Sequence, residues 1–405
     1  MSLQLKSYRI IPRSRNMSIR RELLRVLKPE IEIEVRDKSG RLVRHEIIQG
    51  KCFTRNFVNI LRGSFGNIFI VLTDTGGTQD TYRITYIDEL FSGCVTSRAR
   101  MFNARAGEGV TDYGIVVGTG TTSPTVDDYK LESQIPHGDG DNQLHYDAVA
   151  VEDVVVDTSV SPPIISVTIK RNFTNNGSVD INVNEIGLIV KQGARAALKY
   201  CLVIRDVITT QTVSPGQSIL IKFKIKVQGK FVKNFIDFLH HGFNESNDNV
   251  IDTSGNSKAV MVNSDYHESD AHRDTYRPLG VDAPQDDHSF GIQVGSSDIA
   301  YSYDQYSLQS RYPNSELKHY DCQVLDIIEE TDRFKIPIRR AFENVTDTTK
   351  SIREVGLVAL NHRVVGGITV RSDVKFMILR DVLPTPIDLN PGDIVTITVY
   401  IVVPK

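Results

Sequence analysis

The sequence contains no tryptophan and only 4 cysteines among 405 residues. Cys52, Cys94, Cys201 and Cys322 form no CxxC pair, which excludes the usual zinc-knuckle spacing. Cys201 and Cys322 lie in strand-like apolar runs, where we expect buried, inert thiols rather than disulfides. No apolar run reaches the roughly 18 residues of a membrane helix, and the first 16 residues lack the apolar core of a secretory signal. These absences favour a protein that folds in a reducing cytoplasm and has no membrane partner.

Charge is nearly balanced over the whole chain but is unevenly distributed along it. The formal net charge is −3, which gives no general attraction to nucleic acid or to an anionic membrane. Residues 1–28 carry eight basic side chains and one acidic one, a charge of +7, so the rest of the chain carries −10. The arginines of this basic arm are Arg9, Arg13, Arg15, Arg20, Arg21 and Arg25. We expect an extended arm that orders only against a neighbouring protein subunit; binding to nucleic acid is the less favoured alternative, because the arm has only one aromatic residue, Tyr8.

Local patterns inside and after the arm predict two small elements. The segment "MSIRRELLRVL", residues 17–27, has the composition of a short helix, with Ser18 as its N-cap. The segment "PEIEIEVRDKSGRLVRHEII" alternates apolar and polar residues on both sides of residues 38–40, which predicts a β-hairpin.

The chain contains one sequence unit that occurs twice. The matched blocks, in the same order in both halves, are FTRNFVNILRGSF and FVKNFIDFLHHGF, GIVVG and GIQVG, YKLES and YSLQS, HYD and HYD, and RNFTN and RAFEN. The offset between matched positions stays between 169 and 178 residues. A period of this length is typical of a domain and too long for a solenoid repeat.

Each copy opens with apolar residues at helical spacing and continues with alternating segments such as "SILIKFKIKV" and "DIVTITVYIVV". The sequences "SPGQ" and "NPGD" have the chemistry of a type II turn, which we expect to join two antiparallel strands. The sequence therefore predicts an all-β protein with a basic arm and hairpin in residues 1–50. Two tandem β-sandwich or jelly-roll-like domains follow, in residues 51–228 and 229–405, each opened by a short amphipathic helix.

A glutamate interrupts the same apolar strand in both copies, within "VNEIGLIV" and "REVGLVAL". A carboxylate in such a run must be paired or hydrogen-bonded, and a repeated arginine in "RDV" is a natural bidentate partner. The recurring residues are Glu185, Gly187 and Arg205 in the first copy and Glu354, Gly356 and Arg380 in the second. We interpret them as structural ties; a catalytic role for the carboxylates is the alternative, but no nucleophile or second carboxylate recurs beside them.

Three other segments have some features of binding sites. The loop "VGTGTTSP", residues 117–124, is rich in glycine, but a proline stands where a phosphate-binding loop would begin its helix, so we predict a turn. Asp139 and Asp141 lack the spacing of an EF-hand. The histidines and aspartates of "DYHESDAHRD", in the polar loop 244–280, fit no standard metal spacing. We therefore expect no catalytic residues, no cofactor and no bound metal.

Several blocks together resemble a unit found in structural proteins of tailed viruses of bacteria and archaea. The resemblance rests on RNFVNILRG, LTDTGGTQDTYR, YGIVVGTGTTSPTVDDYKLESQIPHG, VNEIGLIV and IRDVITTQTVSPGQSILIKFKIKV. It spans about residues 53–227 and, more weakly, residues 231–403, where the second copy lacks the Gly-Thr-Gly-Thr-Thr turn. It implies a component of a virion (tail, neck or capsid decoration) that is made in the host cytoplasm and acts by binding itself and other virion proteins.

Two other classes of protein stay open. A carbohydrate-binding or adhesin module would use exposed aromatic residues, and the lack of tryptophan counts against it. A glycan-active enzyme needs two carboxylates at a defined separation, and the sequence nominates no such pair. We therefore predict a structural homo-oligomer without enzymatic activity.

Overall fold

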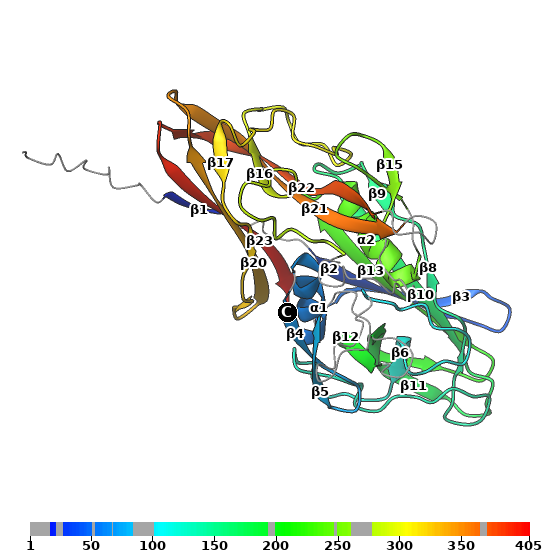
Figure 1. Cartoon of the computed structure of the whole chain (residues 1–405). Helices are drawn as coiled ribbons and strands as arrows, with labels where there is room; N and C mark the ends of the chain where they lie inside the picture. The colour runs from blue at the N-terminus through cyan, green and yellow to red at the C-terminus, as the bar shows by residue number, and fades with distance from the viewer. Residues whose placement is uncertain are drawn as a thin grey trace, which may run out of the picture.

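The chain folds mostly into β-strands, as the sequence predicts (Figure 1). The computed structural model describes residues 17–21, 27–50, 53–66, 68–83, 101–192, 199–246, 249–260, 278–364 and 371–405. Among the strands described, every ladder is antiparallel except the one formed by β1.

A seven-stranded sheet with the order β3-β2-β13-β10-β7 belongs to the first copy, and β8 and β9 also pair with β10. In β13, alternate residues such as Ile221 and Phe223 are buried while Lys222 and Lys224 lie on the other face, so the alternating sequence produces a one-sided strand. The strand bounds are β2 (Lys28–Arg36), β3 (Leu42–Gln49), β7 (His145–Tyr146), β8 (Ala150–Val151), β9 (Val155–Asp157), β10 (Ile164–Thr174) and β13 (Ser218–Gln228).

A six-stranded sheet with the order β1-β23-β20-β17 belongs to the second copy, and β18 and β19 also pair with β20. Its central pair has the register of the first copy, since Phe334 lies opposite Val403 as Ile165 lies opposite Val227. The strand bounds are β1 (Met17–Arg21), β17 (Leu317–His319), β18 (Gln323–Val324), β19 (Ile328–Glu329), β20 (Arg333–Asn344) and β23 (Ile394–Pro404).

Each copy also has a three-stranded sheet, β12-β11-β6 in the first and β16-β21-β22 in the second. The two central strands carry the repeated glutamates at equivalent positions: Glu185 lies opposite Gly118, and Glu354 lies opposite Gly295. The strand bounds are β6 (Gly114–Gly118), β11 (Ile181–Gln192), β12 (Lys199–Val213), β16 (Gly291–Gly295), β21 (Lys350–Val364) and β22 (Arg371–Leu389). The described part of the chain also contains two small hairpins: β4 (Phe69–Thr73) with β5 (Gln79–Arg83), and β14 (Asn249–Ile251) with β15 (Ser257–Ala259).

The two Pro-Gly turns differ in part from the prediction. Gly216 and Gly392 have φ of 75° and 80°, the left-handed backbone that the third position of a type II turn requires. However, the strands that they join do not pair with each other. β12 and β22 lie in the three-stranded sheets, whereas β13 and β23 lie in the larger sheets. The turns therefore carry the chain from one sheet to another and do not close hairpins.

The helices α1 (Arg55–Phe65) and α2 (Lys233–Asn244) lie near the middle of the molecule (Figure 1). Each follows a bridge to its own three-stranded sheet, Phe53 to Ile204 and Phe231 to Leu379. Each also packs against the larger sheet of the other copy: α1 contacts β20, and α2 contacts β8 and β10. The helices therefore connect the two copies.

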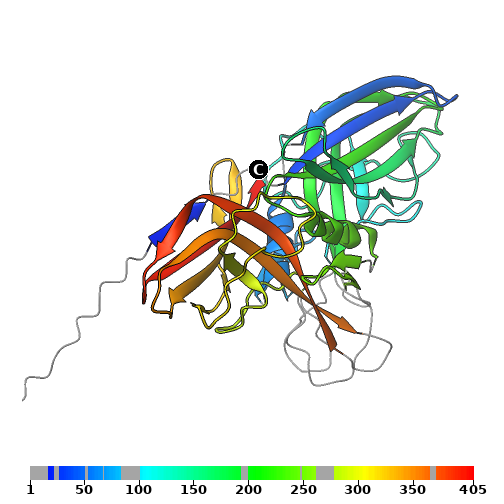
Figure 2. The same ribbon diagram turned by 90° about the horizontal axis from the view of Figure 1, so that it is seen from above.

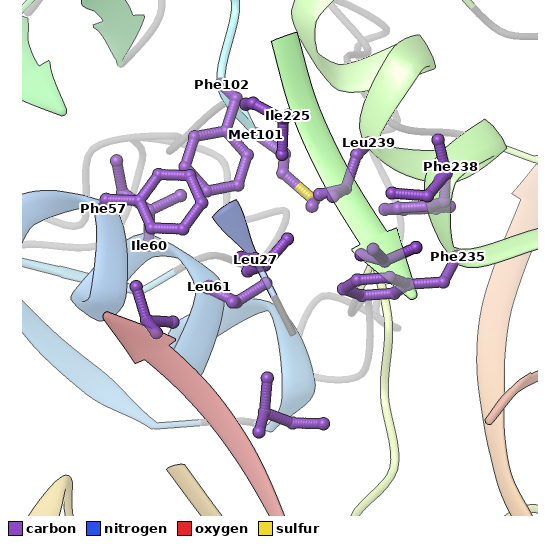
Figure 3. Packing of buried hydrophobic residues seen from close by; sticks show 14 of the residues in the cluster. Leu27, Phe57, Ile60, Leu61, Met101, Phe102, Ile225, Phe235, Phe238 and Leu239 are labelled. Atoms are coloured by element: carbon purple, nitrogen blue, oxygen red, sulfur yellow. The ribbon is translucent and has the colours of Figure 1, made fainter. Parts of the chain in front are cut away.

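Apolar side chains from the two helices meet in a core that both copies share. Figure 3 shows Phe57, Ile60 and Leu61 of α1 and Phe235, Phe238 and Leu239 of α2 on either side of Leu27 and Met101. These side chains are fully buried, and burying one large aliphatic or aromatic side chain stabilises a fold by about 1.5–3 kcal/mol. The copies therefore share a single hydrophobic core.

Backbone hydrogen bonds cross between the copies in a reciprocal way. The amide of Ala104 in the first copy donates to the carbonyl of Phe243 at 3.2 Å, and the amide of Val281 in the second donates to the carbonyl of Phe65 at 2.8 Å. The two donors are matched positions of the repeat, and so are the two acceptors. This is the pattern of a two-fold interface, in which each partner gives and receives the same contact.

The N-terminal segment corrects one prediction. Residues 17–21 form strand β1, not a helix, and this strand pairs with β23 of the same chain. That the arm orders on a neighbouring subunit stays a prediction. The hairpin β2–β3 is confirmed, but it belongs to the first copy's sheet, because β2 pairs with β13. Although close in sequence, β1 and β3 lie towards opposite ends of the molecule (Figures 1 and 2). Arg20 and Arg21 are in β1; Arg9, Arg13, Arg15 and Arg25 lie outside the described residues.

Candidate functional site

The repeated glutamates each lie directly after an irregularity in their strand. The register of β11 against β12 shifts between Val183 and Glu185, and that of β21 against β22 shifts between Ile352 and Glu354. Such bulges turn a side chain in a new direction. Here both carboxylates are 0% exposed, so their hydrogen bonds must come from within the protein.

Glu185 accepts five hydrogen bonds. Its Oε1 accepts from the amides of Gly120 at 3.0 Å and Ser133 at 2.7 Å. Its Oε2 accepts from the amide of Glu132 at 3.0 Å and from Nε and Nη2 of Arg205 at 3.1 and 2.9 Å. The other guanidinium nitrogen of Arg205 donates to Asp128 at 2.7 Å. The predicted pairing of Glu185 with Arg205 is therefore present.

Glu354 makes the equivalent contacts in the second copy. Its carboxylate accepts from the amides of Gln309 at 3.2 Å and Ser310 at 2.8 Å and from Nε of Arg380 at 2.9 Å. It also forms an ion pair with Nη2 of Arg380 at 2.8 Å. Gln305 occupies the position of Asp128 and accepts from Nη1 of Arg380 at 2.9 Å. The second ion pair therefore has an uncharged neighbour where the first has a carboxylate.

Glycines make room for both carboxylates. A Cβ at Gly118 would lie 2.5 Å from the carbonyl oxygen of Ser133, and one at Gly295 would lie 2.4 Å from that of Ser310. Both distances are too short for any residue with a side chain. The predicted site residues Gly187 and Gly356 lie on the same central strands and would direct a Cβ at Leu131 and Leu308, respectively.

The glycine-rich loop at residues 117–124 has its amides already bonded. Gly120 donates to Glu185, and the amides of Thr121 and Thr122 both donate to Oε2 of Glu132 at 2.8 Å. The hydrogen bond from the Thr122 amide is the main reason that the pKa of the Glu132 carboxyl lies below its usual value. Since carboxylates of the chain occupy the positions where a phosphate would bind, this loop supports the strands.

Two buried arginines were not singled out from the sequence. Arg171 donates to the carbonyls of Asp147, Ile115, Gly107 and Val110 at 2.6–3.0 Å. Arg340 does the same in the second copy, with the carbonyls of Tyr320, Phe290, Ile292, Pro284 and Asp287. Burial lowers the pKa of Arg171 to about 10. The signal was available, because both arginines begin matched blocks, RNFTN and RAFEN.

The matched HYD triplets are not structurally equivalent. Tyr146 lies opposite Phe173, but in the second copy His319 lies opposite Phe342. The structural partner of His319 is therefore Tyr146, and the sequence match is wrong by one residue. Both rings are fully buried beside a phenylalanine. Burial, together with the charge of Arg340, lowers the pKa of His319 to about 3, so this ring is uncharged at neutral pH.

The remaining candidate sites make internal contacts or lie outside the described residues. Asp139 accepts from Asn176 at 2.7 Å, and Asp141 accepts from the amide of Ser178 at 2.8 Å. The segment 265–274 lies outside the described residues. Cys201 and Cys322 are free and buried, as expected; burial raises the pKa of Cys322 to about 11.

Within the described ranges, no group of three or more His, Cys, Asp or Glu side chains could hold a metal ion. In the same part of the chain, none of the helices has the length and apolar character needed to cross a bilayer. The described carboxylates Glu185 and Glu354 are buried, with both oxygens accepting hydrogen bonds, so neither presents a free oxygen to a substrate. The hydrogen bonds of the two glutamates therefore hold neighbouring strands and loops in position.

Comparisons with protein-family models, with curated proteins and with solved structures gave no match.

Proposed function

We propose that the protein is a structural component of a viral particle (tail, neck or capsid decoration) and acts through protein–protein assembly, without enzymatic activity. In this proposal each repeat is a β-sandwich or jelly-roll-like domain. The observation that carries it is that the repeated buried polar residues serve to hold strands together. The resemblance of the repeated blocks to virion proteins supplies the viral context.

Exposed edges of the sheets support an assembly role. β3 is an edge strand, and its Leu42, Val43 and Ile47 are 46%, 51% and 53% exposed. An edge strand offers unpaired backbone groups to another chain. The glycan-active alternative has less support, because its general acid needs a raised pKa, whereas the pKa of Glu132, whose backbone amide donates to Glu185, is lowered.

Size-exclusion chromatography with light scattering, followed by negative-stain microscopy, tests this function. We expect the full chain to form rings, tubes or lattices as its concentration rises. A chain that stays monomeric at all concentrations would overturn the assembly role. Hydrolysis of a polysaccharide that a single carboxylate substitution abolishes would replace it with the enzymatic alternative.

A further inference from the structure

The outer edges of the two large sheets are completed very differently. In the first copy, β2 covers β13 along nine residue pairs, from Ser218 opposite Arg36 to Lys226 opposite Lys28. In the second copy, β1 covers β23 along five pairs, from Met17 opposite Val395 to Arg21 opposite Val399. β23 continues to Pro404, and residues 400–404 have no partner on this edge within the described part of the chain.

Charge assigns each N-terminal strand to its own edge. The outward face of β13 carries Lys222, Lys224 and Lys226, and these lysines form ion pairs with Glu30, Glu32 and Glu34 of β2. The matched positions of β23 are Thr398, Tyr400 and Val402, which are uncharged. The sequence of β1, MSIRR, contains no acidic residue that could pair with the lysines of β13. The β23 edge therefore suits β1, and the β13 edge suits β2.

β1 pairs with one strand and is close in sequence to the shared core. Its sole described strand partner is β23, and the next described residue after Arg21 is Leu27, which is fully buried in the shared core. Six peptide units separate Arg21 from Leu27, and they reach about 20 Å when extended. β1 can thus occupy any β23 edge within that distance of its own Leu27.

We propose that β1 is a donor strand exchanged between copies of this chain: the β1 of one copy completes the β23 edge of a second. This inference rests on the proposed assembly function. Exchange reproduces in the partner every ladder hydrogen bond that β1 makes within its own chain, which is why swapping of this kind has a low free-energy cost. The basic arm, at +7, is also attracted to the rest of a neighbouring chain, which carries −10.

Paired cysteines in the β1–β23 register test the exchange. Ser18 lies opposite Thr396, so S18C and T396C are placed in chains with different affinity tags and co-expressed, with Cys52 and Cys94 changed to serine. After mild oxidation we expect disulfide-linked dimers carrying both tags, with up to about half of the donor strands linked between tags, as random exchange between equal amounts of two chains requires. Each single variant expressed alone reports background linkage. Absence of mixed dimers would overturn the proposal.

The double variant S18C/T396C in one chain gives the complementary result. If strands are exchanged, a denaturing gel should show a series of disulfide-linked oligomers. If β1 pairs within its own chain, the disulfide forms inside a monomer, and this result refutes exchange. The matched control is R36C/S218C across β2 and β13, which should close within the monomer in either case.

Deletion of residues 1–21 separates this inference from the function on which it rests. If exchange joins the copies, the deleted chain should remain folded by circular dichroism but lose its oligomers in sedimentation. Oligomers that survive the deletion, together with closed monomeric S18C/T396C, would reject exchange and retain assembly. A full chain that is monomeric throughout, with closed S18C/T396C, would reject both.

Discussion

The first copy surrounds its buried glutamate with two groups that the second copy lacks. In the first copy, Asp128 binds the arginine and the Gly120 amide donates to the carboxylate. In the second, Gln305 replaces the carboxylate, and the other acceptors of Arg380 are the carbonyls of Ile299 and Ala300. Both copies thus keep the Glu–Arg ion pair and the ladder register. The loop beside the ion pair contributes an additional carboxylate in the first copy and an uncharged amide in the second.

The helices differ between the copies in a similar way. Arg62 of α1 reaches the second copy, where its Nε donates to the carbonyl of Leu325 at 2.9 Å and its Nη2 to Asp326 at 2.7 Å. The matched residue of α2 is His240, which is 7% exposed. Lys233 of α2 pairs with Asp237 within its own helix. Charged contacts therefore tie α1 to the other copy, whereas α2 is held mainly by burial.

Removing either glutamate should produce the largest loss of stability, and the two losses should be unequal. Breaking a buried ion pair costs about 3–5 kcal/mol because the remaining charge is left uncompensated. E354A leaves Arg380 with uncharged acceptors, so we expect a loss near the upper end; E185A leaves Arg205 bound to Asp128, so we expect a loss near the lower end. Urea denaturation of the two variants and the wild type measures the difference. Equal midpoints for all three proteins would contradict the structural tie.

The role of Asp128 can be isolated by making the first copy resemble the second. D128Q in the E185A background should raise the cost towards that of E354A, because Arg205 then loses its last carboxylate partner described here. A double-mutant cycle over the two sites gives the coupling energy. A coupling of zero would show that charge does not explain the difference between the copies.

Alanine at the glycines facing the carboxylates should have a smaller effect. G118A and G295A each place a methyl group within about 2.5 Å of a backbone carbonyl oxygen, and overpacking of this kind costs about 1–3 kcal/mol. We expect similar losses in both copies, since the two distances are nearly equal. G107A is the matched control, because the nearest atom to a Cβ there is 4.0 Å away. The check is thermal unfolding; a control that melts as low as the variants would refute the steric explanation.

Loss of the contact between α1 and the second copy should cost about as much as the glycine substitutions. R62A removes a charged donor that is 14% exposed in the wild type, and hydrogen bonds from charged groups are worth about 1.5–3 kcal/mol. D326A should change stability by less than about 0.5 kcal/mol, because Asp326 is 98% exposed. Chemical denaturation compares the two variants. If D326A equals R62A in cost, the Leu325 carbonyl is not the important acceptor.

Acid should weaken the pairing of β2 with β13 in the first copy's sheet. Burial alone would raise the pKa of the Glu34 carboxyl, but hydrogen bonds from Lys222 and Arg36 lower it from 4.5 to about 2. A depressed folded pKa means that this stabilisation is present above pH 4.5 and is lost as the pH falls towards 2. E34Q should therefore show a shallower loss of stability over this range than the wild type. An E34Q profile identical to the wild type would exclude the lysine contact as the cause.

The buried ion pairs could be predicted because they follow from local chemistry. A carboxylate inside an apolar strand has few allowed partners, and an arginine recurs at the matched position in both copies. The strands could be predicted from the sequence as well, because alternation such as that of β13 is a local signal. The bulges that turn Glu185 and Glu354 inward have no such signal.

Features that depend on contacts between distant segments could not be predicted from the local sequence. Residues 17–21 were predicted to be helical, but β23 offers a row of backbone hydrogen bonds that outweighs a weak local preference. The identity of the HYD triplets suggested a register that the ladder with β20 excludes, because the ring beside Phe342 is that of His319. The crossing of α1 and α2 onto the opposite sheets has no signature in either helix sequence.

The reciprocal bonds from Ala104 to Phe243 and from Val281 to Phe65 give this single chain the internal symmetry of a dimer. A true dimer must repeat every feature on both sides, so an acceptor edge on one half would also be present on the other. A fused chain is free of that constraint, and here one edge carries lysines while its counterpart carries Thr398 and Tyr400. With one donor strand and one matching edge, each molecule has two connections of opposite polarity. Units of that kind grow in one direction and close into rings or extend as filaments, and they do not branch.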